Sequence, residues 1–137
     1  IGSSHSGWRG TVARIGQKTI KKMAEQFGSR PEDIICIIGP SICRKCYEVS
    51  EDVILEFKKS FAPEHWEKLF YKKENGKYQL NLWEANKIIF TEAGVTENHI
   101  SMPGICTCCN PELLYSHRAS KGKRGNLAAF LGLKRSE

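Results

Sequence analysis

The stretch LNLWEANKIIFTEAGV, residues 80–95, carries a clear helix signal. Asn81 is a residue type typical of a helix N-cap, and Gly94 stands where a helix commonly ends. Between them, apolar residues recur at helical spacing and form one apolar face: Leu82, Ala85, Ile88 and Ile89. This pattern predicts an amphipathic helix that packs against a core, around which the other elements can be placed.

Two further helices are predicted upstream. From Thr11 to Phe27 apolar residues lie at near-helical spacing, and Gly28 follows as a stop signal. Ser50 is a suitable cap for a second helix, which carries apolar residues at four-residue spacing and ends before Pro63: Val53, Phe57 and Phe61. Residues 62–70 form a shorter amphipathic segment.

Strand signals are spread between and after these helices. Residues 34–38 are apolar throughout and predict a buried strand, and Asn75-Gly76 predicts a hairpin within 70–82. Three more strands are predicted in the last third of the chain, over 99–107, 113–118 and 126–133, with loops at 41–50, 108–112 and 119–125. Helices and strands alternate irregularly, which favours an α+β or mixed α/β fold in one domain, residues 1–137.

Composition places the chain among ordinary globular proteins. It has 137 residues with 21 Lys+Arg against 15 Asp+Glu, a net charge of +6, which favours anionic partners. The basic residues stand in separate short groups, which indicates solvated side chains and argues against nucleic-acid binding. Neither a membrane span nor a signal peptide is evident, so we expect a cytoplasmic protein with no membrane contact, whose six cysteines are reduced thiols.

The segment HSGWRGT, residues 5–11, is the first candidate site. Its glycines permit tight backbone turning, and the helix behind it presents free N–H groups. Arg9 adds a fork of hydrogen-bond donors suited to phosphate. The segment is therefore either an anion cradle or a glycine-rich turn in which Trp8 is a packing anchor.

Cysteines form the second candidate site. Cys43 and Cys46 make a C-x-x-C pair, and a second group of three follows about sixty positions later: Cys106, Cys108 and Cys109. A four-cysteine zinc site is one interpretation, although the two groups are farther apart than in a zinc ribbon. Redox use of the first pair is less favoured, because Gly39-Pro40 separates it from the preceding strand.

A third polar group lies in YSHRASKGKR, residues 115–124. In a strand, Tyr115 and His117 would face one side while Ser116 and Arg118 faced the other. A basic loop next to a polar strand is commonly solvent-facing. Together with Arg9, however, it could complete an anion site.

The order of these motifs resembles a known family. HSGWRGT, IGPSICRKCYEVS, LNLWEANKIIFTEAGV and ICTCCNPELLYSHRASKGKRGNLAAFLGL are similar to the laccase-domain, or multicopper polyphenol oxidase-like, proteins, whose members are mainly regarded as purine nucleoside phosphorylases. The resemblance implies an α+β fold with mixed sheets stacked in the middle and helices outside, in α/β/β/α layers. It also implies that this chain matches the C-terminal half of a longer protein, whose N-terminal half is in cis or a separate chain.

The resemblance assigns roles to individual residues. The family's motif histidine is a ligand of a transition metal, usually zinc and sometimes copper, which carries to His5. The family's other two ligands, a histidine and a cysteine, lie upstream of the motif, and no cysteine of this chain matches that position. Arg9 and Arg118 are implied as catalytic phosphate contacts, and four residues as substrate contacts: Trp8, Tyr47, Tyr115 and Arg124. Arg118 ranks above Arg124, because Gly125-Asn126 replaces the Gly-Arg usual before the last strand.

The implied reaction is phosphorolysis of adenosine, inosine or methylthioadenosine to a free base and a pentose 1-phosphate, with adenosine deamination as a related capability. Copper-dependent phenol oxidation and a non-catalytic zinc-binding module are the alternatives. The copper alternative lacks support in the residues, because the blue-copper pattern of two histidines, a cysteine and an axial methionine is not found.

Overall fold

The structure is a computed structural model that describes residues 1–123 and 125–134. Five α-helices are present in this described part: α1 (Trp8–Val12), α2 (Ile15–Phe27), α3 (Glu51–Ser60), α4 (Trp66–Leu69) and α5 (Leu82–Glu92). Five short strands accompany them: β1 (Cys36–Ile37), β2 (Glu48–Val49), β3 (Phe70–Lys72), β4 (Tyr78–Leu80) and β5 (Ile100–Ser101). Single 3₁₀ turns cover Pro31–Asp33, Pro63–His65 and Glu97–His99. No described helix has the length and apolar character needed to cross a membrane.

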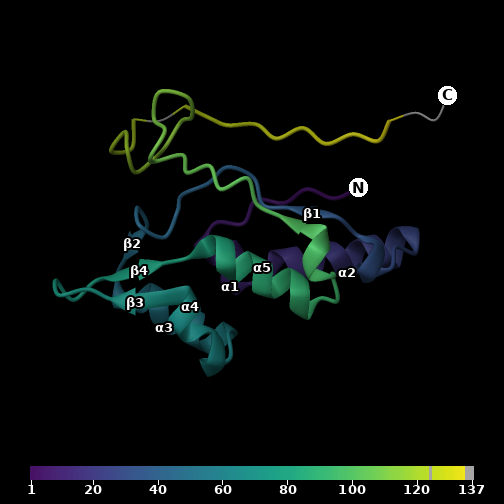
Figure 1. Cartoon of the computed structure of the whole chain (residues 1–137), viewed down its shortest axis with the longest axis horizontal. Coiled ribbons are helices and arrows are strands. Elements are labelled where there is room, and N and C mark those ends of the chain that lie inside the picture. The colour runs from purple at the N-terminus through teal and green to yellow at the C-terminus, as the bar shows by residue number, and fades with distance from the viewer. Residues whose placement is uncertain (124, 135–137) are drawn as a thin grey trace.

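Helix α5 lies in the middle of the helical layer and contacts α1, α2 and α4 (Figure 1). Its predicted ends are confirmed, since the Glu84 N–H donates to Asn81 Oδ1 at 3.2 Å and Gly94 adopts a φ of +94° just beyond the helix. Its apolar face enters the main core, whose largest fully buried side chains are Ile54, Phe57, Leu69, Leu80 and Ile89. The sequence stretch at 80–95 thus organises the fold as predicted.

The helix predicted over 11–27 is two helices, so that prediction of one continuous helix is wrong. Arg14 has a left-handed conformation, with a φ of +57°, and breaks the helix between α1 and α2. The break is held by long-range contacts, because Arg14 Nη1 donates to the Ser60 carbonyl at 3.1 Å and Arg14 pairs with Glu92. Without Gly or Pro at this point, the local sequence contains no sign of the break.

Two small sheets lie among the helices. Strands β2, β4 and β3 form an antiparallel sheet in that order, and the β3–β4 hairpin turns at Asn75-Gly76, as predicted. Strands β1 and β5 pair in parallel, with Cys36 opposite Ile100. The mixed α and β class is confirmed. Strand β2, within the segment predicted to be a loop at 41–50, was missed.

Strand β1 is half-buried, whereas the sequence predicted a strand buried on both faces. Ile34 and Cys36 are buried, but Ile35 is 73% and Ile37 67% exposed. The period of two is that of a strand with one face on the core. The continuous apolar run at 34–38 therefore conceals an alternating pattern of burial.

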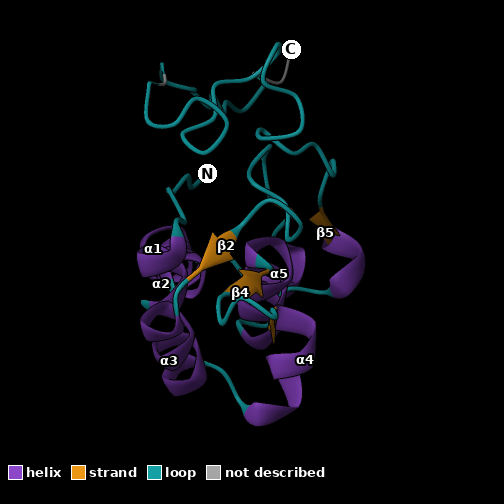
Figure 2. Cartoon of the chain, turned by 90° about the vertical axis from the view of Figure 1, so that its left-hand side faces the viewer, coloured by secondary structure: helices purple, strands orange, loops and turns teal. Residues whose placement is uncertain are grey.

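The last third of the chain consists mainly of turns and extended chain, most of which lies along one side of the helical layer (Figure 1 and Figure 2). The strands predicted at 113–118 and 126–133 are absent from the described residues, and 99–107 forms only β5 and one bridge, Ser41 to Cys106. Side-chain hydrogen bonds favour turns here, because Asn110 Nδ2 donates to the Cys106 carbonyl and the Ser116 hydroxyl accepts from the Ala119 N–H.

Residues 126–133 have no strand partner in the described chain. Figure 1 shows this segment running apart from the helices. Its apolar side chains lie open to solvent, with Phe130 94% and Leu133 79% exposed. A strand needs a neighbouring strand to satisfy its backbone groups, so the predicted pattern cannot produce one here.

Candidate functional site

The segment Ser6–Thr11 is fixed to α5 by a buried polar network. Ser6 Oγ donates to Asn86 Oδ1 at 2.7 Å, and Asn86 Nδ2 donates to Thr11 Oγ1 at 3.3 Å. Thr11 is fully buried and Asn86 is 6% exposed, so both side chains depend on these partners. The sequence analysis missed this network, although an asparagine four residues after Leu82 on the inward face of the helix is a signal for one.

His5 lies beside the glycines of the same segment. A Cβ atom on Gly7 would come within 3.2 Å of His5 Nε2, and one on Gly10 within 3.1 Å of the His5 carbonyl oxygen. Because Gly7 and Gly10 have no side chains, His5 can lie close to the start of α1. Among the described residues no group of three or more possible metal ligands includes His5, so these residues alone do not form the metal site implied for it.

The structure brings four of the predicted site residues together from three parts of the chain. The Arg9 guanidinium lies 4.3 Å from the Trp8 ring centre, and the Arg118 guanidinium lies 5.5 Å from that of Tyr47. Burial raises the pKa of Tyr47, and the positive charges of Arg118 and Arg9 partly offset that rise. Both arginines therefore act electrostatically on one phenol. We call Trp8, Arg9, Tyr47 and Arg118 the arginine–aromatic cluster.

Backbone and ion-pair contacts position the Tyr47 side of this cluster. Arg118 Nη1 donates to the Glu48 carbonyl at 3.0 Å, which fixes the guanidinium over β2. The Glu48 carboxylate turns to the hairpin instead, where bonds from Lys73 and Asn75 lower its pKa to about 2. Glu48 is thus a structural anion, and its main chain orients Arg118.

The two other predicted substrate contacts are not brought to this cluster by any described interaction. Tyr115 is 60% exposed, and a Cβ on Gly125 would lie 2.7 Å from its ring, so the tyrosine covers that glycine. The strand faces predicted for Tyr115 and His117 do not exist, because the segment consists of turns. Arg124 lies outside the described residues.

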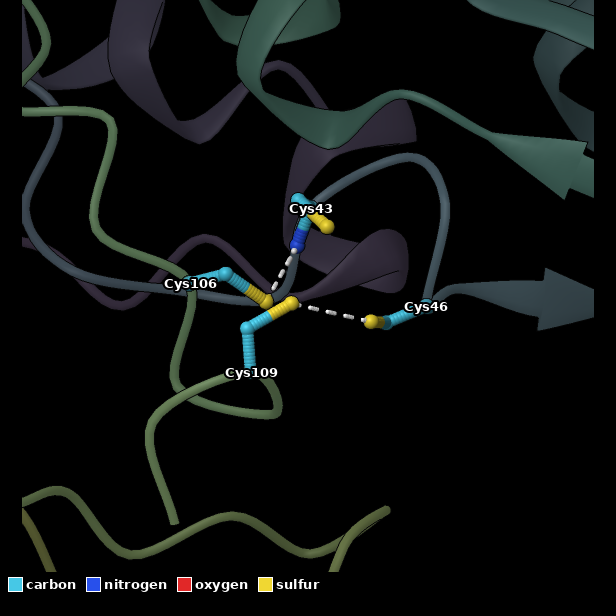
Figure 3. A group of neighbouring side chains, drawn as sticks. All are labelled: Cys43, Cys46, Cys106 and Cys109. Atoms are coloured by element: carbon cyan, nitrogen blue, oxygen red, sulfur yellow. Dashed lines mark hydrogen bonds between the residues drawn. The ribbon is translucent and has the colours of Figure 1, made fainter. Parts of the chain in front are cut away.

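Four of the six cysteines form a compact group at the junction of two distant loops (Figure 3). The Sγ atoms of Cys43, Cys46, Cys106 and Cys109 all lie within 4.8 Å of one another, and those of Cys46 and Cys109 are 3.4 Å apart. Cys108 stands between two members of the group and interacts with Cys46, but its sulfur does not lie within 4.8 Å of all four. We call these four residues the cysteine cluster.

Main-chain N–H groups surround one of these sulfurs. The Cys43 N–H donates to Cys106 Sγ at 3.3 Å. Burial on its own would raise the pKa of Cys106, but hydrogen bonds from the backbone N–H groups and the thiols of Cys43 and Cys109 together outweigh it and lower the pKa to about 7. These bonds stabilise the thiolate of Cys106, which is the form of cysteine that binds metals.

Comparisons with known proteins agree with both the sequence motifs and the fold. A family model described as multi-copper polyphenol oxidoreductase laccase matches residues 1–134. The chain is 38% identical to purine nucleoside phosphorylase YlmD of Bacillus subtilis over 134 residues, which are 98% of this chain and 48% of that protein. It is 33% identical over 118 residues to adenosine deaminase RL5 of an unknown prokaryote, covering 86% of this chain and 44% of that protein.

A solved structure of a related protein has a similar fold. The crystal structure of YlmD from Geobacillus stearothermophilus superposes with a TM-score of 0.82 at 34% identity, over 89% of this chain and 45% of that one. The chain thus spans about half the length of the curated relatives it matches. With the family model matching nearly its whole length, the chain belongs to the multi-copper polyphenol oxidoreductase laccase family.

Proposed function

We propose that the protein acts as a purine nucleoside phosphorylase, converting adenosine, inosine or methylthioadenosine with phosphate to a free base and a pentose 1-phosphate. The observation that carries this proposal is the convergence of Arg9 and Arg118 on Tyr47, beside a relative of 38% identity named as such a phosphorylase. Two permanent cations near one partly buried phenol suit an anionic co-substrate.

In the proposed reaction a phosphate oxygen bonds to C1′ of the ribose while the glycosidic C–N bond breaks. The bond's electron pair leaves with the purine, which takes up a proton. Arg9 and Arg118 would bind the phosphate through charge-assisted hydrogen bonds and stabilise the negative charge of the reacting groups. The Tyr47 phenol is protonated at neutral pH, as tyrosine ordinarily is, and burial raises its pKa further, so its hydroxyl can donate to substrate.

Aromatic faces would hold the base. Trp8 packs partly against the main core and presents its ring to Arg9, and Tyr47 does the same with Arg118. Rings of this kind stack on purines irrespective of base identity. Tyr115 would contact substrate only when a further part of the protein brings it to this cluster, and Arg124, which lies outside the described residues, remains a proposed substrate contact.

We further propose that the protein extends beyond this chain, either in cis or through another chain. The exposed apolar side chains of Leu127, Phe130, Leu131 and Leu133 support this, because a strand-like segment with exposed apolar residues is a pairing surface. The same further part would supply the ligands that complete a zinc or copper site at His5. Such a metal would polarise a bound oxygen, which suits the deamination for which one relative is named.

The direct test is release of hypoxanthine from inosine by the full-length protein, with and without phosphate. We expect release only with phosphate, and a decrease of about 10²-fold in kcat for Arg118→Ala or Arg9→Ala, since each removes one preorganised donor. Arg30→Ala is the matched control, because Arg30 is exposed and pairs only locally with Asp33 and Glu32 among the described contacts. Hypoxanthine release without phosphate, or none with phosphate, would overturn the proposal.

A further inference from the structure

The cysteine cluster joins two turns that lie sixty-three residues apart in sequence. In the first, the Cys46 N–H donates to the Cys43 carbonyl at 3.1 Å; in the second, the Asn110 N–H donates to the Cys106 carbonyl at 3.2 Å. Each turn carries two cysteines of the cluster with two residues between them. Paired turns of this kind present their sulfurs toward a shared point, as Figure 3 shows.

Hydrogen bonds that do not involve the sulfurs also hold the two turns together. Ser41 forms a parallel bridge with Cys106, its N–H donating to the Ile105 carbonyl and its carbonyl accepting from the Thr107 N–H, both at 3.2 Å. Trp83 Nε1 of α5 donates to Ser41 Oγ at 2.6 Å and ties the bridge to the core. The cluster is therefore preorganised on the fold.

The sulfur positions fit a tetrahedral metal. Four sulfurs bound to zinc at about 2.3 Å lie about 3.8 Å from one another, which falls between the 3.4 Å of Cys46–Cys109 and the 4.8 Å limit of the group. Four thiolates are soft ligands that select zinc over magnesium or calcium.

We propose that Cys43, Cys46, Cys106 and Cys109 bind one structural zinc ion with all four thiolates, at a site separate from His5. Four protein ligands leave no open position, so the ion would stabilise the fold and take no part in catalysis. The zinc ion would join the turn-rich segment after Cys106 to the loop that carries Cys43 and Cys46. In the described structure that segment contains no helix or strand that could hold it in place. Binding would thus contribute directly to folding of that segment.

The proposed zinc site is adjacent in sequence to residues of the arginine–aromatic cluster and can help to position them. Tyr47 directly follows Cys46, and the chain after Cys109 leads to Arg118, which lies on the Tyr47 ring. Zinc binding itself does not depend on the proposed phosphorylase reaction, so the two can fail separately.

The test uses the full-length protein, purified under reducing conditions and loaded with zinc. The Cys43→Ser, Cys46→Ser double variant should lose one zinc ion per chain by elemental analysis and the thiolate-to-metal absorption band of the cobalt-substituted protein. Cys108→Ser, the matched control, should keep both. His5→Ala should keep the cysteine-bound ion, whatever it does to another metal. An unchanged zinc content and cobalt band in the double variant would overturn the proposal.

A second measurement needs no variant and so does not depend on the mutants folding. Thiols of the wild-type protein are alkylated before and after chelation, and the labelled peptides are identified by mass spectrometry. Cys46 and Cys109 should be protected at least tenfold by zinc, whereas Cys108 should react equally in both states. Equal labelling of Cys109 with and without zinc, or a Cys46–Cys109 disulfide in the reduced preparation, would refute the zinc site.

Discussion

Replacing Asn86 by alanine removes the link between α5 and the segment that carries His5 and Arg9. Asn86 makes three hydrogen bonds with its side chain: it accepts from Ser6 at 2.7 Å and donates to the Leu82 carbonyl at 2.8 Å and to Thr11 Oγ1 at 3.3 Å. It is 6% exposed, so water cannot replace these partners. The substitution therefore leaves polar groups unpaired in the interior.

The loss of stability follows from these contacts. Each net hydrogen bond contributes about 1 kcal/mol, and the three together about 3 kcal/mol. Alanine favours the helix by about 0.6 kcal/mol over asparagine, which offsets part of the loss. We expect the free energy of unfolding to decrease by roughly 2–3 kcal/mol. The upper value applies if the partners of Asn86 are left buried without hydrogen bonds.

Urea unfolding followed by tryptophan fluorescence measures this change. Thr91→Ala is the control, because Thr91 lies on the exposed face of the same helix and should change stability by less than about 0.5 kcal/mol. Ser6→Ala combined with Asn86→Ala should show a coupling energy of at least about 0.5 kcal/mol, as expected of residues in contact. If Asn86→Ala were no more destabilising than the control, or the two changes were additive, the network would not be what fixes the segment.

Three other predictions follow from burial and charge. Phe57 is fully buried and stacked on Phe61 at 5.5 Å, so Phe57→Ala should lower the unfolding free energy in urea by about 3–5 kcal/mol; a loss below about 1 kcal/mol would contradict the assigned core. Bonds from Lys73 and Asn75 lower the folded-state pKa of Glu48 to about 2, whereas its unfolded-state pKa is about 4.3. The ionised Glu48 therefore contributes its full stabilisation above about pH 4.3, and this stabilisation is lost as the pH falls toward 2. The stability difference between wild type and Glu48→Gln, from urea titrations at several pH values, should therefore shrink from pH 6 to pH 2, and a constant difference would exclude the ion pair. The Phe130 ring is 94% exposed, so Phe130→Ser should leave the melting temperature of this chain unchanged and should reduce any self-association measured by light scattering. A lower melting temperature would show that Phe130 packs on the fold.

The sequence was informative where structure is local. The caps of α5, the Gly28 stop after α2 and the Asn75-Gly76 hairpin were predicted correctly, because each depends on residues only a few positions apart. Ser50 occupies the predicted N-cap of α3, but its hydroxyl pairs with the Asp52 side chain and not with a backbone N–H. Even here, the position was predicted and the bond was not.

Predictions failed where tertiary contacts decide. The left-handed turn at Arg14 depends on Ser60 and Glu92, which no local pattern reveals. The strand predicted over 126–133 has suitable residues but no partner in the described chain.

The candidate site divides in the same way. The types of residue in HSGWRGT indicated anion binding, and the family resemblance singled out Arg118. Their convergence on Tyr47 required the structure, as did the separation of Cys108 from the cysteine cluster. Spacing alone could not distinguish among three cysteines within four positions.

The parallel pairing of β1 with β5 has a consequence for how the chain folds. Residues 48–93, with the hairpin and three helices, contain every buried residue of the main core and can begin to fold early, whereas Cys36 must wait for Ile100. At a synthesis rate of 5–20 residues per second, about sixty residues separate these partners by roughly 3–12 s. During that interval β1 is an unpaired edge, and Ile37 within it and the adjacent Ile35 are exposed even in the folded chain, so the nascent chain is most vulnerable to aggregation before its last third is made.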